Sequence, residues 1–161
     1  MEGRQTSTHL RIQHMLVIIP YEAVGTIHFG MSAAEAIQSL GQPKHRAKNR
    51  RDEIVYRYPD FSVTFSGGDE RVVEVGMTPQ ADVRLDGVDI FKSPDSFEIL
   101  VRKDGASFES LGFIILLNLG ITLTGFHDDD PAQKAVTAFK RGRWDHLRDG
   151  FKEYVHTPKH F

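Results

Sequence analysis

The run His127-Asp128-Asp129-Asp130 holds the side chains with the most evident chemistry in this sequence. Three carboxylates and an imidazole offer the oxygen and nitrogen donors that divalent cations accept. Adjacent residues rarely converge on one ion, however, and the sequence has no second cluster at the spacing of metal ligands. Because Asp130 is followed by Pro131, we predict a solvated acidic turn. A turn of this kind could mimic nucleic acid or cap a basic active site on a protein partner.

The pair Arg143 and Trp144 is a second candidate contact, because Arg and Trp are residue types that dominate binding hot spots. Four residues recur at helical spacing in this region and predict a short C-terminal helix over residues 143–155: Trp144, Leu147, Phe151 and Tyr154. The competing interpretation of Trp144 is therefore that it anchors this helix to a sheet. Both interpretations stay open at this point.

A basic stretch from Lys44 to Arg51 places five positive charges in eight residues: Lys44, Arg46, Lys48, Arg50 and Arg51. Contact with phosphate groups is one use for such a cluster. No aromatic residue is interleaved, so stacking on single-stranded nucleic acid is unsupported. We interpret the stretch as a flexible, solvated connection and keep RNA binding as a weaker hypothesis.

No arrangement in the sequence rises to a catalytic signature. Asp95 and Glu98 stand three residues apart, but the helix dipole explains two acids in the first turn of a predicted helix. The eight histidines are scattered, and zinc-protease, nucleophile-elbow, phosphate-loop and dinucleotide motifs do not occur. The sequence therefore predicts no catalytic residue, no metal site and no cofactor.

Composition narrows the class of protein. The chain has 22 acidic and 20 basic residues, and the formal net charge of -2 removes any global electrostatic reason to bind nucleic acid or membrane. It has no cysteine, which excludes disulfides and thiolate chemistry. The apolar runs from Met15 to Ile19 and from Gly112 to Phe126 are too short for a signal core and a membrane span, respectively. We therefore expect a soluble, cytoplasmic protein.

The best-marked element is a helix over residues 33–40. Ser32 and Glu35 form a capping box at its start, Gly41 supplies a cap at its end, and Pro43 prevents continuation. Strands with alternating apolar residues follow over residues 53–58, 61–65 and 71–77.

A second helix is predicted to start at the N-cap Ser93, with Pro94 in its first position, and to end near Lys103. Four strands follow, around Phe108 and over residues 112–117, 121–126 and 134–140.

The same order of elements occurs twice. Phe29 and Phe91 stand 62 residues apart, each ahead of a Ser-capped helix and a meander, which indicates a divergent internal duplication. The predicted fold is α+β, with two tandem helix-plus-antiparallel-meander units that form a combined sheet with the helices on one face. The expected organisation is an N-terminal extension or tag remnant (1–14), one domain (15–155) with repeats over about 16–80 and 86–142 and a C-terminal helix, and a tail (156–161).

Glycines and caps mark the segment from Gly25 to Pro79, notably Gly25, Gly30, Met31, Ser32, Leu40, Gly41 and Pro43. With the meander that follows, this pattern resembles the small repeat of the BamE (SmpA) outer-membrane assembly lipoproteins and of the β-lactamase inhibitory proteins. The sequence departs from both, because it lacks the lipoproteins' N-terminal cysteine and the inhibitors' disulfides. The resemblance implies a protein-binding surface rather than a catalyst, and compact cytosolic proteins of this kind also resemble toxin-neutralising immunity proteins.

The leading hypothesis is a non-catalytic protein-binding module, such as an immunity-type inhibitor of a toxin or enzyme. Its expected contacts are His127, Asp128, Asp129, Asp130, Arg143 and Trp144. Two alternatives stay open: a small-ligand or metal-dependent enzyme that uses the loop from His127 to Asp130, and an RNA-binding accessory protein. We expect a protein partner rather than nucleic acid, no membrane association, and a monomer or a homodimer formed through an exposed edge strand.

Overall fold

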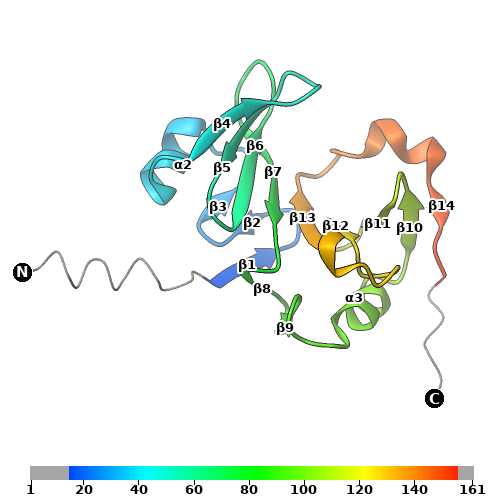
Figure 1. Ribbon diagram of the computed structural model, residues 1–161. Helices are drawn as coiled ribbons and strands as arrows, with labels where there is room; N and C mark the ends of the chain where they lie inside the picture. Colours follow the sequence, from blue (N-terminus) through cyan, green and yellow to red (C-terminus); the bar gives the residue numbers. More distant parts are fainter. Residues whose placement is uncertain (1–14, 156–161) are drawn as a thin grey trace, which may run out of the picture.

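The computed structural model describes residues 15–155, which fold into two β-sheets with two α-helices packed against them (Figure 1). The protein therefore belongs to the α+β class, as the sequence predicts. The predicted extension (1–14) and tail (156–161) lie outside the described residues. None of the helices within residues 15–155 is both long enough and apolar enough to cross a membrane.

The larger sheet is antiparallel and contains two four-stranded meanders joined edge to edge. In spatial order its strands are β14 (Lys152–Glu153), β10 (Ser107–Ser110), β11 (Phe113–Leu116), β12 (Ile121–Thr124), β13 (Ala135–Phe139), β7 (Val72–Met77), β6 (Phe61–Phe65), β5 (Ile54–Arg57) and β4 (His45–Lys48). The meanders meet where β7 pairs with β13, with Gly76 opposite Thr137. Both meanders therefore belong to one continuous nine-stranded sheet.

The smaller sheet connects the starts of the two halves of the chain. Its spatial order is β3 (Ile27–His28), β2 (Ala23–Val24), β1 (Met15–Ile19), β8 (Asp82–Leu85) and β9 (Val88–Asp89). Strands β1 and β8 are parallel, with Leu16 opposite Val83. Ile18 and Leu85 point inward and join the core. The apolar run from Met15 to Ile19 forms β1, whereas the sequence does not predict this second sheet.

Helix α2 (Ala33–Leu40) begins with the predicted capping box. The Ser32 N–H donates to Glu35 Oε1 at 2.9 Å, and the Glu35 N–H donates to Ser32 Oγ at 3.2 Å. The helix ends at the predicted Gly41, whose φ of 84° is in the region that favours glycine. Local chemistry alone fixes both ends of this helix.

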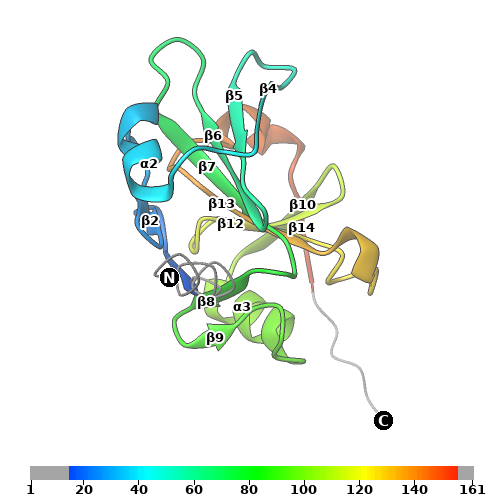
Figure 2. The same ribbon diagram turned by 60° about the vertical axis from the view of Figure 1, so that its left-hand side comes forward.

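Both helices pack against one hydrophobic core. Ala36 of α2 and Leu100 of helix α3 (Ser96–Asp104) belong to the same cluster of buried side chains as Val63 and Val136 of the larger sheet. Figure 2 shows α2 beside the first meander and α3 beside the second. The core thus fills the space between the helices, the smaller sheet and one face of the larger sheet.

Helix α3 begins later than the sequence indicates. Its N-cap is Asp95 rather than Ser93, and the cap makes no side-chain hydrogen bond. The Ser96 N–H donates to the Ser93 carbonyl oxygen at 3.2 Å, and Ser96 Oγ donates to the Ile90 carbonyl oxygen at 2.6 Å. The Ser93-Pro94 pair therefore forms a turn ahead of the helix instead of capping it.

Two other segments differ from their predicted form. The basic stretch is not a flexible connection, because residues 45–48 form β4 at the outer edge of the larger sheet. The region predicted as a C-terminal helix contains a 3₁₀ helix (Asp145–Gly150) followed by β14, which pairs with β10. In both places strand pairing with a neighbour overrides the local pattern.

Candidate functional site

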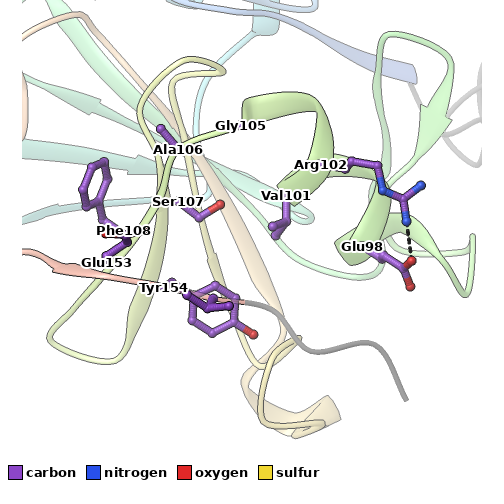
Figure 3. Close-up of a pocket in the computed structure, with 10 residues that line it drawn as sticks. Glu98, Val101, Arg102, Gly105, Ala106, Ser107, Phe108, Glu153 and Tyr154 are labelled. Atoms are coloured by element: carbon purple, nitrogen blue, oxygen red, sulfur yellow. Dashed lines mark hydrogen bonds and ion pairs between the residues drawn. The ribbon is translucent and has the colours of Figure 1, made fainter. Parts of the chain in front are cut away.

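A hollow of about 660 Å³ lies between α3 and the edge formed by β10 and β14. Figure 3 shows Val101 projecting from α3 on one side of this hollow, with Ser107 of β10 across from it and the Tyr154 ring, just after β14, below both. Glu98 and Arg102 form an ion pair one turn apart on the helix. Strand β14 builds one side of this hollow, because the Tyr154 N–H donates to the Ser107 carbonyl oxygen at 2.9 Å.

A second hollow of about 700 Å³ adjoins the first at the N-terminal end of α3. The two share Glu98, Tyr154 and Val155 in their linings, so they form one surface along the helix. We call this surface the α3 groove. His127 and Asp129, both predicted as site residues, line its second part.

Aromatic rings form the lining of the groove near His127. The Phe97 ring centroid lies 6.3 Å from that of Phe126, 6.5 Å from that of His127 and 6.0 Å from that of Tyr154. Lys134 Nζ lies 5.0 Å from the centroid of the Phe126 ring, a cation–π contact. His127 Nδ1 is buried and has no hydrogen-bond partner among the described residues. A buried polar atom without a partner destabilises the free protein, and a bound group that supplied a hydrogen bond would relieve that cost.

The acidic turn, residues 127–130, depends on the conformation of Gly125. That glycine has a φ of +78°, and a Cβ there would lie 2.6 Å from the Asp130 carbonyl oxygen, so a larger residue would not fit. The Asp130 N–H donates to the Gly125 carbonyl oxygen at 3.0 Å and closes the turn. Asp128 and Asp129 are exposed, whereas Asp130 is half-buried. The turn therefore presents two of its three carboxylates to solvent beside the groove.

The position of α3 depends on a buried carboxylate at its C-terminal end. Asp104 accepts hydrogen bonds from the N–H groups of Ala106, Asn118 and Leu119 at 3.2, 2.8 and 2.9 Å. Burial raises the pKa of the Asp104 carboxyl in spite of these bonds. The network joins the end of α3 to the turn between β11 and β12, and so it fixes the helical wall of the groove.

Arg143 lies outside the groove and is engaged inside the protein. Its guanidinium donates to both carboxylate oxygens of Glu53, and its Nε donates to Glu74 Oε1 at 2.9 Å. The side chains of Arg143 and Glu53 are only 10% and 7% exposed. The hydrogen bonds from Arg143 lower the pKa of Glu53 to about 2. Arg143 therefore has a structural role, in which it attaches the segment after β13 to the first meander, and its contact with a partner stays a prediction.

Trp144 also packs internally. Its ring centroid lies 5.6 Å from that of Phe113, 6.4 Å from that of Phe139 and 6.2 Å from that of Phe151. The ring centroid of Phe151 in turn lies 5.9 Å from that of Phe108. These contacts agree with the interpretation of Trp144 as an anchor, although the segment that it anchors is a 3₁₀ helix and a strand.

The aromatic lining is the part of the site that sequence reasoning missed. Phe97 belongs to α3, whereas Phe126 lies just after β12 and Tyr154 just after β14, so the three rings are far apart in the chain. The available signal was the high count of eleven Phe, which indicates aromatic packing but does not say which rings meet.

Searches among known protein families, curated proteins and solved structures give no match to this chain. The function is therefore inferred from the site itself.

Proposed function

We propose that the protein is a non-catalytic protein-binding module whose contact surface is the α3 groove together with the acidic turn. The observation that carries the proposal is the combination of an aromatic-lined groove and exposed carboxylates beside it. Protein interfaces are built in this way, with buried aromatic anchors at the centre and polar residues around them. Hollows of about 660 and 700 Å³ leave room for several side chains of a partner.

The charges near the groove favour a basic partner surface. Asp95 and Asp129 line the second hollow, and Asp128 is exposed next to it. Lys134, on the same wall, lies against the Phe126 ring. A basic loop or a basic active site would complement the exposed carboxylates. This is the contact expected of an immunity-type inhibitor that neutralises a toxin or enzyme, and the resemblance to β-lactamase inhibitory proteins supports the same class.

The proposal includes an origin by duplication and a cytoplasmic location. In each half of the chain, one helix precedes four antiparallel strands: α2 precedes β4 to β7, and α3 precedes β10 to β13. This repeated order supports two tandem units of the kind seen in BamE-like repeats. The lack of cysteine supports a reducing compartment.

The test is capture of a partner by the tagged protein from a lysate of the source cells, at physiological and then high salt. The test variant is Asp128→Asn, Asp129→Asn and Asp130→Asn together. A matched control with the same change in charge combines Glu22→Gln, Asp60→Asn and Asp149→Asn, which lie outside the groove lining. We expect one stoichiometric protein that survives high salt, bound by the wild type and the control, with an affinity at least about tenfold lower for the test variant.

Equal affinity of the test variant and the wild type would remove the acidic turn from the interface. A Phe97→Ala variant then tests the groove separately, because Phe97 contacts three rings of its lining. Retention of the partner by this variant, with its fold intact, would reject the groove as the binding surface.

A second candidate function is the binding of a small ligand, and the unpaired Nδ1 of His127 is the observation that favours it. Within residues 15–155, no three His, Asp or Glu side chains are placed so that they could hold a metal ion. A ligand site would therefore rely on the imidazole and the rings rather than on a metal. If the protein binds a small ligand, adding that ligand should raise the melting temperature of the wild type. The variant His127→Phe should show no such rise.

A further inference from the structure

Strand β4 forms an outer edge of the larger sheet that the described part of the chain does not cover. It pairs with β5 on one side only, and it lies at the end of the sheet opposite β14 (Figure 1). All four of its residues are exposed. An edge of this kind presents backbone N–H and C=O groups that can pair with another strand.

The register shows which backbone groups of β4 point outward. Lys48 lies opposite Ile54, and just beyond this pair the Asn49 N–H donates to the Glu53 carbonyl oxygen at 3.0 Å. Residues in an antiparallel pair alternate between groups that bond to the neighbour and groups that point away. The N–H and C=O groups of Lys48 and Arg46 therefore face away from β5 and are the ones open to a new strand.

The side chain of Arg46 leaves this edge accessible. Its guanidinium carbon lies 4.8 Å from the centroid of the Tyr56 ring, and its Nη2 donates to Gln42 Oε1 at 2.6 Å. The side chain is thus held against the face of the sheet rather than across its edge. A hollow of about 380 Å³, lined by Arg46, Lys48 and Tyr56 among others, lies beside the strand. A side chain of an added strand could enter it.

The charge around β4 selects the partner. Five cations lie between residues 44 and 51, and this stretch contains no acidic residue. A carboxylate in the hollow beside β4 would meet two cations, Arg46 and Lys48, against one acidic residue of the lining, Glu70. Such complementary charges favour association and fix the register of the bound segment.

We infer that β4 is a docking edge for an extended acidic segment of a protein partner, which adds to the larger sheet as a further strand. This surface is separate from the α3 groove and lies at the other end of the sheet. Strand addition obtains its affinity from main-chain hydrogen bonds and its specificity from the alternate side chains.

The opposite edge of the same sheet shows this mode of binding within the chain. There, β14 pairs with β10 through only two residues, with Glu153 opposite Phe108 and Lys152 opposite Glu109. Flanking aromatic residues hold the segment in place, since Phe151 packs on Phe108 and Tyr154 packs on Phe97. A short extended segment with side-chain anchors is therefore enough to complete an edge of this sheet.

Two other occupants fit β4 less well. A second copy of the chain paired through β4 would bring two sets of five cations together, which destabilises a strand pair. Single-stranded RNA would need open aromatic faces for its bases, and Arg46 already covers the Tyr56 ring.

The test uses a synthetic peptide in which glutamate alternates with valine, at about 1 mM so that even a weak complex is populated. Hydrogen exchange followed by NMR reports the backbone amides of the full chain. We expect the amides of Arg46 and Lys48 to gain protection of about tenfold or more when the peptide is added. The variant Lys48→Glu/Arg50→Glu should lose this protection, and the control Lys140→Glu/Lys152→Glu should retain it.

A second pair of variants isolates the backbone. Lys48→Ala and Lys48→Pro both remove the charge, but only proline removes the outward N–H. The affinity for the peptide should fall further for Lys48→Pro than for Lys48→Ala. An unchanged melting temperature of both variants would show that the hydrogen bonds between β4 and β5 are intact.

Three results would overturn the inference. Equal protection by a peptide with lysine in place of glutamate would reject the acidic partner. Protection of the Arg46 and Lys48 amides that increases with protein concentration in the absence of peptide would show pairing between two copies of the chain. No protection of Arg46 and Lys48 by the peptide, whether or not an oligouridylate binds, would show that β4 does not accept a strand.

Discussion

The two outer edges of the larger sheet differ in what covers them. At one end the chain returns after β13, packs Trp144 and Phe151 against the second meander, and adds β14 to β10. At the other end β4 carries four exposed residues and has no further strand among the described residues. Edges of sheets are protected by a cover or by charge, and this protein uses a cover at one end and basic residues at the other.

The segment from residue 140 to 151 is what makes the two ends different. It is held to the first meander by ion pairs of Arg143 and to the second by aromatic rings. One attachment is polar and buried, whereas the other is apolar and half-exposed. Changes at the two attachments should therefore affect the protein differently, and they can be ranked.

The largest effect is expected from Arg143→Ala. Removal of the guanidinium leaves the Glu53 carboxylate, 7% exposed, without its cation, and loss of one partner of a buried pair costs about 3–5 kcal/mol. The free energy of unfolding, measured by chemical denaturation, should fall by that amount. Arg102→Ala is the control, because its ion pair with Glu98 is exposed and should be worth less than about 1 kcal/mol. A loss of under about 1 kcal/mol in both variants would show that Arg143 does not hold the segment.

The next effect is a loss of stability in acid. The pKa of Glu53 is about 2 in the folded protein and 4.5 in its ordinary state. A lowered pKa stabilises the fold fully above pH 4.5, and this contribution disappears as the pH falls from about 4.5 toward about 2. The difference between these two pKa values corresponds to about 3 kcal/mol. It should appear as a drop in the free energy of unfolding over that range.

The variant Glu53→Gln isolates this contribution. Asp104 has a raised pKa, so its protonation in acid favours the folded state and opposes the effect of Glu53. Asp104 is present in both proteins and cancels in the difference between them. The difference in stability between wild type and Glu53→Gln should therefore shrink as the pH falls through this range. If this difference in stability does not change with pH, Glu53 is not the source of the stability lost in acid.

The features that could be predicted from the sequence are those with local causes. The ends of α2 follow from Ser32, Glu35 and Gly41, all within ten residues of each other. The alternation around Val63 identifies β6, and the acidic turn follows from Pro131 and its neighbours. His127 was predicted as a site residue for its chemistry, and the structure places it beside aromatic rings that the sequence did not indicate.

The features that could not be predicted depend on contacts between distant residues. Arg143 bonds to Glu53, which is 90 residues earlier in the chain, so this internal ion pair could not be predicted from the sequence. Strand β8 pairs in parallel with β1, and two-residue strands such as β9 have no period to detect. The start of α3 was misplaced because Ser96 bonds to Ile90 and Ser93 outside the helix, a contact that capping rules do not include.

The smallest of the ranked effects, Phe151→Ala, bears directly on the difference between the two edges. Phe151 is half-buried against Phe108 and Trp144, so its truncation should cost about 1–2 kcal/mol, less than for a fully buried ring. Without this anchor, β14 should detach more often from β10. The Tyr154 amide, which donates to Ser107, should then exchange its hydrogen at least about tenfold faster, as local opening becomes easier. The control Leu111→Ala removes an apolar side chain that is 76% exposed on the neighbouring turn and should change neither quantity. If the exchange rate of the Tyr154 amide is unchanged in Phe151→Ala, backbone pairing alone holds β14 on β10. The aromatic anchor would then not be the reason that this edge is covered while β4 is not.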